Sequence, residues 1–266
     1  MANAICLGEL LIDFVPTVTG TGLTDAPAFI KAPGGAPGNV AVGLARLGVK
    51  SAFMGKVGDD AFGHFLADTL AEAGVDVGPL RFSSEARTAL AFVSLRADGE
   101  REFMFYRHPS ADMLFTPREV DMDAISRAKL LHFGSISLIG EPSRSATLYA
   151  VDAARAAGGL VSYDPNLRLP LWPDADAARK GMLLGLSKAH IVKLSDDESE
   201  FLTGLSDLKA ACQALWHEDL KLMVVTRGRA GCVYFTPSFT GMVESFTVEA
   251  VMPTTISFAG MAMRSR

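Results

Sequence analysis

Cysteine is scarce in this sequence, and Cys6, Cys212 and Cys232 lie far apart without CxxC spacing. Such spacing argues against a zinc site and a disulfide framework, and it suits a reducing compartment. The net charge is −5 and no block of basic residues occurs, which argues against nucleic acid or an anionic membrane surface as a partner. No apolar run approaches membrane-spanning length.

The N-terminal segment MANAICLGELLIDFVP lacks the basic region of a targeting peptide, and Gly8, Glu9 and Asp13 interrupt its apolar run. The pattern predicts a buried strand over residues 4–15 instead. Together with the cysteine usage, it leads us to expect a soluble, cytoplasmic protein.

The familiar nucleotide-binding fingerprints are also missing. No GxGxxG follows a strand, and no GxxxxGK[ST] occurs. The nearest candidate, GKV at residues 55–57, lacks both the upstream glycine and the hydroxyl. Neither a Rossmann dehydrogenase nor a Walker-type ATPase is supported.

Apolar strand-like runs alternate with amphipathic helices along the 266 residues. Helix–strand pairs are predicted over residues 116–136, 145–166, 174–195 and 207–226. Repeated pairs of this kind predict an α/β fold with a doubly wound, mostly parallel sheet and helices on both faces. We expect one domain over residues 1–266.

One segment breaks this alternation. RTALAFVSLRADGEREFMFYR contains two strand-like runs around Asp98-Gly99, which is a hairpin signal. Its Phe and Tyr residues favour a small β-lid, formed from about residues 12–32 and 86–112. The alternative is a surface ribbon with no role.

The segment PGGAPGN is rich in glycine at the start of a predicted helix. Gly34, Gly35 and Gly38 allow close backbone approach and positive φ, and Pro37 suits a first helical turn. Free N–H groups at the helix start, with Asn39 as donor and acceptor, suit a polyhydroxy ligand or an anion. The alternative is a tight strand-to-helix turn selected for its geometry alone.

This glycine segment resembles the first signature of the ribokinase-like (PfkB) carbohydrate kinases, and Gly48 and Gly58 fit the same pattern. The resemblance extends along nearly the whole chain and is greatest to fructokinases, through GELLIDFVP, GKVGDDAFG, YDPNLRLPLWP and VTRGRAGC. It implies a ribokinase-like fold with a β-lid, and transfer of the γ-phosphate of Mg-ATP to the C6 hydroxyl of fructose. It also implies Mg²⁺, K⁺ as in some members, and a homodimer through the lid.

The resemblance implies a sugar site at the end of the first strand. Asp13 would accept hydrogen bonds from sugar hydroxyls, and Gly34, Gly35 and Asn39 would complete the site. Arg107 would reach over the sugar from the base of the lid. Without the resemblance, Asp13 could be a cap or an ion-pair partner and Arg107 a solvated charge.

The resemblance places the phosphates near DPNLR, which follows a predicted strand. Arg168 would stabilise the transition-state charge, because a guanidinium fork suits phosphoryl oxygens. Asn166 and Lys193 would contact the nucleotide, and Asp164 and Glu198 would serve the metal, Glu198 through water. Without the resemblance, acidic residues in the first turn of a helix indicate only ordinary complementation of the helix dipole.

Further nucleotide contacts are implied by later segments. Ser195 stands where some members carry asparagine, and Thr226, Gly228 and Gly231 resemble the turn under the ATP phosphates or ribose. Taken alone, the latter three residues indicate only a hairpin turn.

The family's general base lies in a late segment of the type DTTGAGD, whose glycine turn also holds the anion. Here the resemblance continues to Val251, after which MPTTISFAGMAMRSR contains no aspartate. We therefore expect turnover at least about a thousandfold slower than in an intact relative, and exposed apolar sheet surface. Two alternatives remain open: a non-catalytic form that binds sugar or pairs with an intact subunit, and a kinase for another sugar or a nucleoside.

Overall fold

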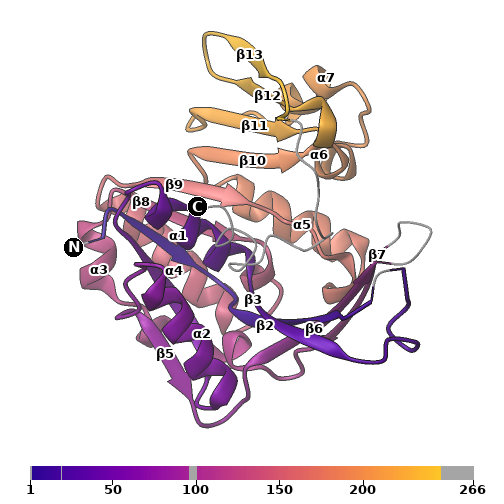
Figure 1. Cartoon of the computed structure of the whole chain (residues 1–266). Coiled ribbons are helices and arrows are strands. Elements are labelled where there is room, and N and C mark those ends of the chain that lie inside the picture. The colour runs from indigo at the N-terminus through magenta and orange to yellow at the C-terminus, as the bar shows by residue number, and fades with distance from the viewer. Residues whose placement is uncertain (1, 19, 96–100, 247–266) are drawn as a thin grey trace.

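The computed structural model describes residues 2–18, 20–95 and 101–246. They form a large sheet with helices packed against it, and a smaller four-stranded sheet that lies at the lower right in Figure 1. The predicted α/β class is confirmed. None of the helices in the described ranges is both long and apolar enough to cross a lipid bilayer.

The large sheet has nine strands and is mostly parallel. Neighbouring strands pair parallel across most of the described sheet, and the two strands at one edge pair antiparallel. In spatial order the strands are β13 (Thr240–Val243), β12 (Cys232–Phe235), β11 (Leu222–Thr226), β10 (Ile191–Ser195), β9 (Leu160–Asp164), β8 (Leu130–Gly134), β1 (Ala4–Leu7), β4 (Ser51–Gly58) and β5 (Leu80–Ser83).

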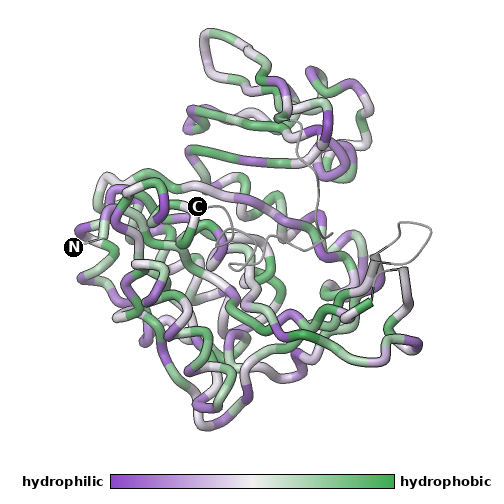
Figure 2. Tube along the Cα trace, in the orientation of Figure 1, coloured by the Kyte–Doolittle hydropathy of each residue, from purple (hydrophilic) through white to green (hydrophobic). Residues whose placement is uncertain are grey.

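Helices cover both faces of this sheet, because successive residues of a buried strand point to opposite sides. On β1, Ile5 and Leu7 enter one apolar core and Cys6 enters another. The core around Cys6 is closed by α1 (Ala36–Arg46) and α2 (Ala61–Glu72). The other is closed by α3 (Met122–Arg127), α4 (Ser143–Ala156), α5 (Ala175–Leu186), α6 (Asp196–Thr203) and α7 (Leu208–Leu215). Hydrophobic residues accordingly follow the central strands in Figure 2.

The smaller sheet is called the lid here. Its strands, in spatial order, are β3 (Phe29–Gly34), β2 (Leu11–Pro16), β6 (Ala89–Leu95) and β7 (Arg101–Tyr106). β6 and β7 pair antiparallel, with Leu90 opposite Tyr106. Residues 96–100, which include the predicted turn at Asp98-Gly99, lie outside the described residues.

The predicted N-terminal strand over residues 4–15 is wrong in one respect, because the chain divides it between two sheets. β1 ends at Leu7 in the large sheet, and β2 begins at Leu11 in the lid. Gly8 has φ 151, and a Cβ on Gly55 would lie 2.5 Å from the Gly8 carbonyl oxygen. The close crossing at Gly8 therefore redirects the chain from one sheet to the other.

Apolar side chains are exposed around β13, the last strand of the large sheet. Met242 and Val243 are 62% and 50% exposed, and Phe246, just beyond the strand, is 87% exposed. This agrees with the expectation of exposed apolar surface. The segment after Val251, where the family resemblance ends, lies outside the described residues.

Candidate active site

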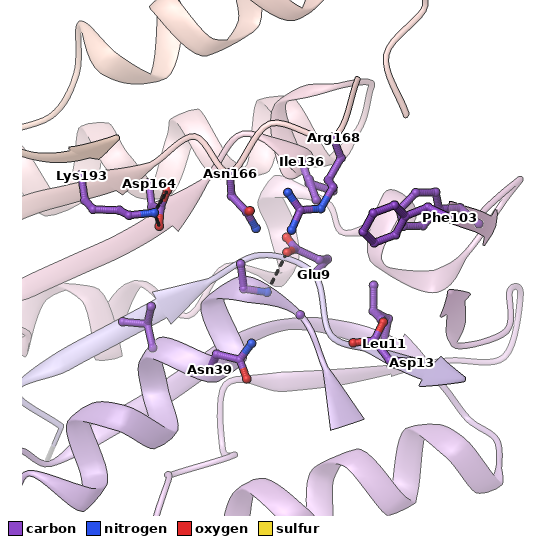
Figure 3. A pocket seen from close by; sticks show the side chains of 14 residues that line it. Glu9, Leu11, Asp13, Asn39, Phe103, Ile136, Asp164, Asn166, Arg168 and Lys193 are labelled. Atoms are coloured by element: carbon purple, nitrogen blue, oxygen red, sulfur yellow. Dashed lines mark hydrogen bonds and ion pairs between the residues drawn. The ribbon is translucent and has the colours of Figure 1, made fainter. Parts of the chain in front are cut away.

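A cavity of about 410 Å³ lies where the lid meets the large sheet. Strands β2 and β7, the start of α1, the end of β9 and the middle of β10 all contribute to it (Figure 3). Its lining residues are Glu9, Leu11, Asp13, Gly35, Ala36, Asn39, Val40, Phe103, Phe105, Ile136, Asp164, Asn166, Arg168 and Lys193. Segments predicted separately for sugar and phosphate thus meet in one cavity.

The glycine-rich turn is held tightly against the strand that carries Asp13. A Cβ on Gly34 would lie 2.8 Å from Asp13 Cγ and 3.0 Å from Leu11 Cδ1. Gly35 has φ 110, and a Cβ there would lie 2.5 Å from the Glu9 carbonyl oxygen. Both positions therefore require glycine, because a side chain would displace the turn or the Asp13 carboxylate.

The first turns of α1 supply polar groups to the cavity. Pro37 stands in the first turn of the helix, and Asn39 lines the cavity. Asn39 Oδ1 is buried and has no hydrogen-bond partner among the described residues. A buried acceptor without a partner is costly, so this oxygen is available to a donor on a ligand.

Asp13 is buried at the edge of the cavity. Burial raises the pKa of its carboxyl group to about 6, and the Arg168 guanidinium partly opposes this shift. Arg168 donates to the Leu167 carbonyl oxygen at 2.9 Å, and its guanidinium lies 5.6 Å from the centre of the Phe103 ring. Arg168 thus contacts the lid from the strand-end loop and acts electrostatically on the Asp13 carboxylate.

Asp164 and Lys193 form an ion pair on neighbouring strands, with Nζ 3.1 Å from Oδ2. Burial raises the pKa of Asp164, and Lys193 opposes the shift. Asn166 adopts the left-handed region with φ 47, which asparagine tolerates better than most residues. A strained residue beside paired charges in a cavity is typical of a functional loop.

Arg107 does not line this cavity. Its side chain is buried, so the alternative of a solvated lid charge is wrong. Its Nε donates to Asp112 Oδ2 at 3.1 Å, and Nη2 pairs with the same oxygen. Arg107 lines a neighbouring hollow with Arg87 and His108.

Glu198 and Ser195 form a capping box at the start of α6. Ser195 Oγ accepts the Glu198 N–H, and Glu198 Oε2 accepts the Ser195 N–H at 2.8 Å. Glu198 Oε1 accepts the Leu167 N–H at 2.7 Å, which ties α6 to the DPNLR loop. Within the described ranges, no three His, Cys, Asp or Glu side chains are grouped to hold a metal ion.

The other predicted nucleotide residues lie at the end of β11 and in the turn that leads to β12, outside the cavity lining. Thr226 donates to the Leu194 carbonyl oxygen at 3.2 Å. Gly228 and Gly231 have φ 52 and 79, and a Cβ on Gly231 would overlap the β13 backbone. The fold therefore requires glycine at Gly231 whether or not a nucleotide binds.

Several residues that line the cavity were not predicted from the sequence. Phe103 and Phe105 lie on the same face of β7, and their alternation in REFMFY could have indicated a shared surface. Glu9 was noted only as an interruption of an apolar run, and Leu11, Val40 and Ile136 carried no signal that separates them from core residues.

The model for the pfkB family carbohydrate kinases matches residues 1–255. This chain belongs to that family. Probable fructokinase-4 of Arabidopsis thaliana is 57% identical over 248 residues, which cover 93% of this chain and 76% of that protein. Fructokinase-2 of Solanum lycopersicum is 56% identical with the same coverage.

Solved structures agree with the family assignment. The ATP-bound fructokinase of Xylella fastidiosa aligns with a TM-score of 0.84 and 39% identity, over 94% of this chain and 76% of that one. The fructokinase of Vibrio cholerae O395 with fructose, ADP and calcium aligns with a TM-score of 0.83 and 35% identity, over 94% and 78% of the two chains. The ribokinase-like fold predicted from the resemblance is confirmed.

Proposed function

We propose that this pfkB family kinase is an ATP-dependent fructokinase that transfers the γ-phosphate of ATP to the C6 hydroxyl of fructose. The observation that carries the proposal is the cavity itself, which combines hydroxyl-binding groups on Asp13 and Asn39 with the cations of Arg168 and Lys193. Its relatives of 55–57% identity bear the name fructokinase.

The sugar binds between β2 and the glycine-rich turn in this proposal. The Asp13 carboxylate and the free Asn39 Oδ1 accept hydrogen bonds from the sugar hydroxyl groups, and Gly34 and Gly35 let the backbone approach the ring. Phe103 and Phe105 on the lid exclude water above it. Arg107, held by Asp112, supports the lid base close to the sugar.

The nucleotide binds along the ends of β9, β10 and β11. Arg168 stabilises the charge that develops on the transferred phosphoryl group. Asn166, Lys193 and Ser195 contact the phosphates, and the turn with Thr226, Gly228 and Gly231 lies under the phosphates or ribose.

Mg²⁺ would neutralise phosphate charge, held by Asp164 and Glu198. The donors suit a hard cation, because Glu198 uses only two of about four lone-pair sites for the Leu167 and Ser195 N–H groups. Magnesium normally takes one or two carboxylates and completes its shell with phosphates and water. K⁺ is proposed as a further ion only by analogy with some members.

The reaction also requires a base for the C6 hydroxyl. Of the three acids that line the cavity, Asp13 serves the sugar, Asp164 pairs with Lys193, and Glu9 accepts the Ala36 N–H. A polypeptide of these 266 residues, which carries no aspartate after Val251, should therefore turn over at least about a thousandfold more slowly than a relative with the GAGD-type segment.

Two alternative functions and a homodimer are also proposed. A non-catalytic role as a sugar-binding subunit is favoured by the engagement of the lining acids Asp164 and Glu9 in other contacts. Another sugar or a nucleoside as acceptor is compatible with the same cavity. Met104 and Tyr106 on β7, one of the two edge strands described in the lid, are 41% and 57% exposed, which favours a homodimer through the lid in a cytoplasmic protein.

The test is phosphorylation of a panel of fructose, glucose, ribose and adenosine with Mg-ATP, alongside calorimetric titration of each. Fructose binding with slow fructose phosphorylation supports the proposal. Fructose binding with no turnover favours the non-catalytic role. Preferential binding of another acceptor by the folded chain would replace fructose, and sedimentation velocity would report the dimer.

A further inference from the structure

The Glu9 carboxyl group lies buried beneath the glycine-rich turn. Its side chain lines the cavity in the connection between β1 and β2. Oε1 accepts the Ala36 N–H at 3.0 Å, the dashed contact in Figure 3. The Glu9 backbone carbonyl also lies directly under Gly35. Side chain and backbone of one residue thus support the same turn.

The same carboxyl group interacts electrostatically with the base of the lid. Arg107 and Asp112 form a buried ion pair, and Ser110 Oγ donates to the second oxygen of Asp112. The Arg107 charge attracts the Glu9 carboxylate, whereas the Asp112 charge repels it. Glu9 therefore contacts the turn proposed to hold the sugar and also interacts electrostatically with the arginine that supports the lid.

Keeping an ionisable group at this position is costly for folding. Burial raises the pKa of Glu9 to about 7, so at pH 8 the fold must accommodate a buried carboxylate. Its Oε2 atom is buried and has no hydrogen-bond partner among the described residues. A neutral side chain of the same shape would avoid this cost. The negative charge of Glu9 therefore serves some role other than stabilising the fold.

We propose that Glu9 is a positioning residue of the sugar site. Its Oε1 atom fixes the Ala36 end of the glycine-rich turn, and its carboxylate charge keeps the Arg107–Asp112 pair in a fixed position relative to that turn. Sugar affinity then depends on Glu9 although the sugar need not touch it. The ligand in this inference, fructose, rests on the proposed function.

Glu9→Gln and Glu9→Ala separate the two parts of this role at pH 8. Glu9→Gln retains an acceptor for the Ala36 N–H and removes the charge, so fructose affinity should fall about tenfold while the free energy of unfolding stays equal or rises. Glu9→Ala removes both parts, so affinity should fall roughly a hundredfold and the Ala36 amide should exchange faster with deuterium. Calorimetry, urea unfolding and amide exchange are the three measurements.

Glu119→Gln is the matched control. Glu119 Oε1 pairs with Lys56 Nζ at 2.7 Å and Oε2 accepts the Thr116 N–H at 2.8 Å, away from the cavity lining. Its loss should lower stability and leave fructose affinity unchanged. If Glu9 had a structural role alone, its variants would lose fructose affinity in proportion to their loss of stability, and that result would overturn the inference.

The outcomes keep this inference separate from the proposed function. Wild-type affinity in both Glu9 variants overturns the inference and leaves the function intact. If the wild-type chain binds no sugar, the proposed function is overturned and the inference is decided by the Ala36 amide alone: unchanged exchange in Glu9→Ala refutes it, and faster exchange supports the positioning of the turn. If Glu9→Ala does not fold, the isosteric Glu9→Gln still tests the inference, because its fructose affinity should fall while its free energy of unfolding stays equal or rises.

Discussion

Gly34→Ala is the substitution with the most direct prediction for the sugar site. The new Cβ would lie 2.8 Å from Asp13 Cγ and 3.0 Å from Leu11 Cδ1, well inside ordinary contact distance. Because Asp13 is only 5% exposed, its carboxylate has little room to move. Overpacking of this kind costs about 1–3 kcal/mol. Displacement of a charged acceptor should cost a further ~1.5–3 kcal/mol in fructose binding, or roughly ten- to a hundredfold in Kd.

Gly43→Ala provides the control within the helix that follows the turn. A Cβ at Gly43, in α1, would meet nothing within 4 Å. Alanine should therefore stabilise the helix by about 0.5–1 kcal/mol and leave fructose affinity unchanged. Calorimetry with fructose and urea unfolding of both variants would test the pair. Wild-type affinity in Gly34→Ala would refute the reasoning, because the Asp13 carboxylate would then not depend on the bare backbone opposite it.

Other parts of the fold give three further predictions. Asp60→Ala removes the N-cap that accepts the Phe62 and Gly63 N–H groups, so urea unfolding should show a loss of about 2 kcal/mol. Gly181→Ala places a Cβ 2.5 Å from Trp172 Cζ3, so thermal unfolding should show a loss of about 1–3 kcal/mol, and wild-type stability would contradict this. The raised pKa of Glu9, from 4.5 to about 7, means that the folded state binds more protons, so its contribution to stability falls as pH rises through that range. The wild type should lose roughly 3 kcal/mol relative to Glu9→Gln between pH 4 and pH 8, and parallel pH profiles would contradict this.

The later half of the large sheet was predictable because each helix–strand pair carries complete local signals. β10 and α6 show this well: an apolar strand ends at Ser195, and Ser195 and Glu198 form the capping box that starts the helix. The N-terminal strand was not predictable in the same way. Apolar residues continue through residues 4–15, but β1 and β2 belong to different sheets. Only the crossing of Gly8 and Gly55 decides where the chain turns, and that contact joins positions far apart in sequence.

The same distinction applies to the site. Asp13, Asn39 and Arg168 line the cavity, and the family resemblance, rather than their positions alone, singled them out in the sequence. Phe103 and Ile136 line the same cavity but resemble core residues in the sequence. Which face of a lid strand they occupy depends on register, and register depends on pairing across the sheet.

Arg107 shows that the position of a residue near a binding site does not by itself establish whether the residue contacts the ligand. In sequence it is one cation in a polar segment, and only folding buries it against Asp112, five positions later. Because both charges leave water together, removal of either leaves the other uncompensated, so substitution of Arg107 alone would destabilise the lid base as well as any sugar contact. Loss of sugar affinity in an Arg107 variant therefore cannot by itself identify a sugar ligand. Glu9→Gln is more informative, because it removes a neighbouring charge while leaving the Arg107–Asp112 pair intact.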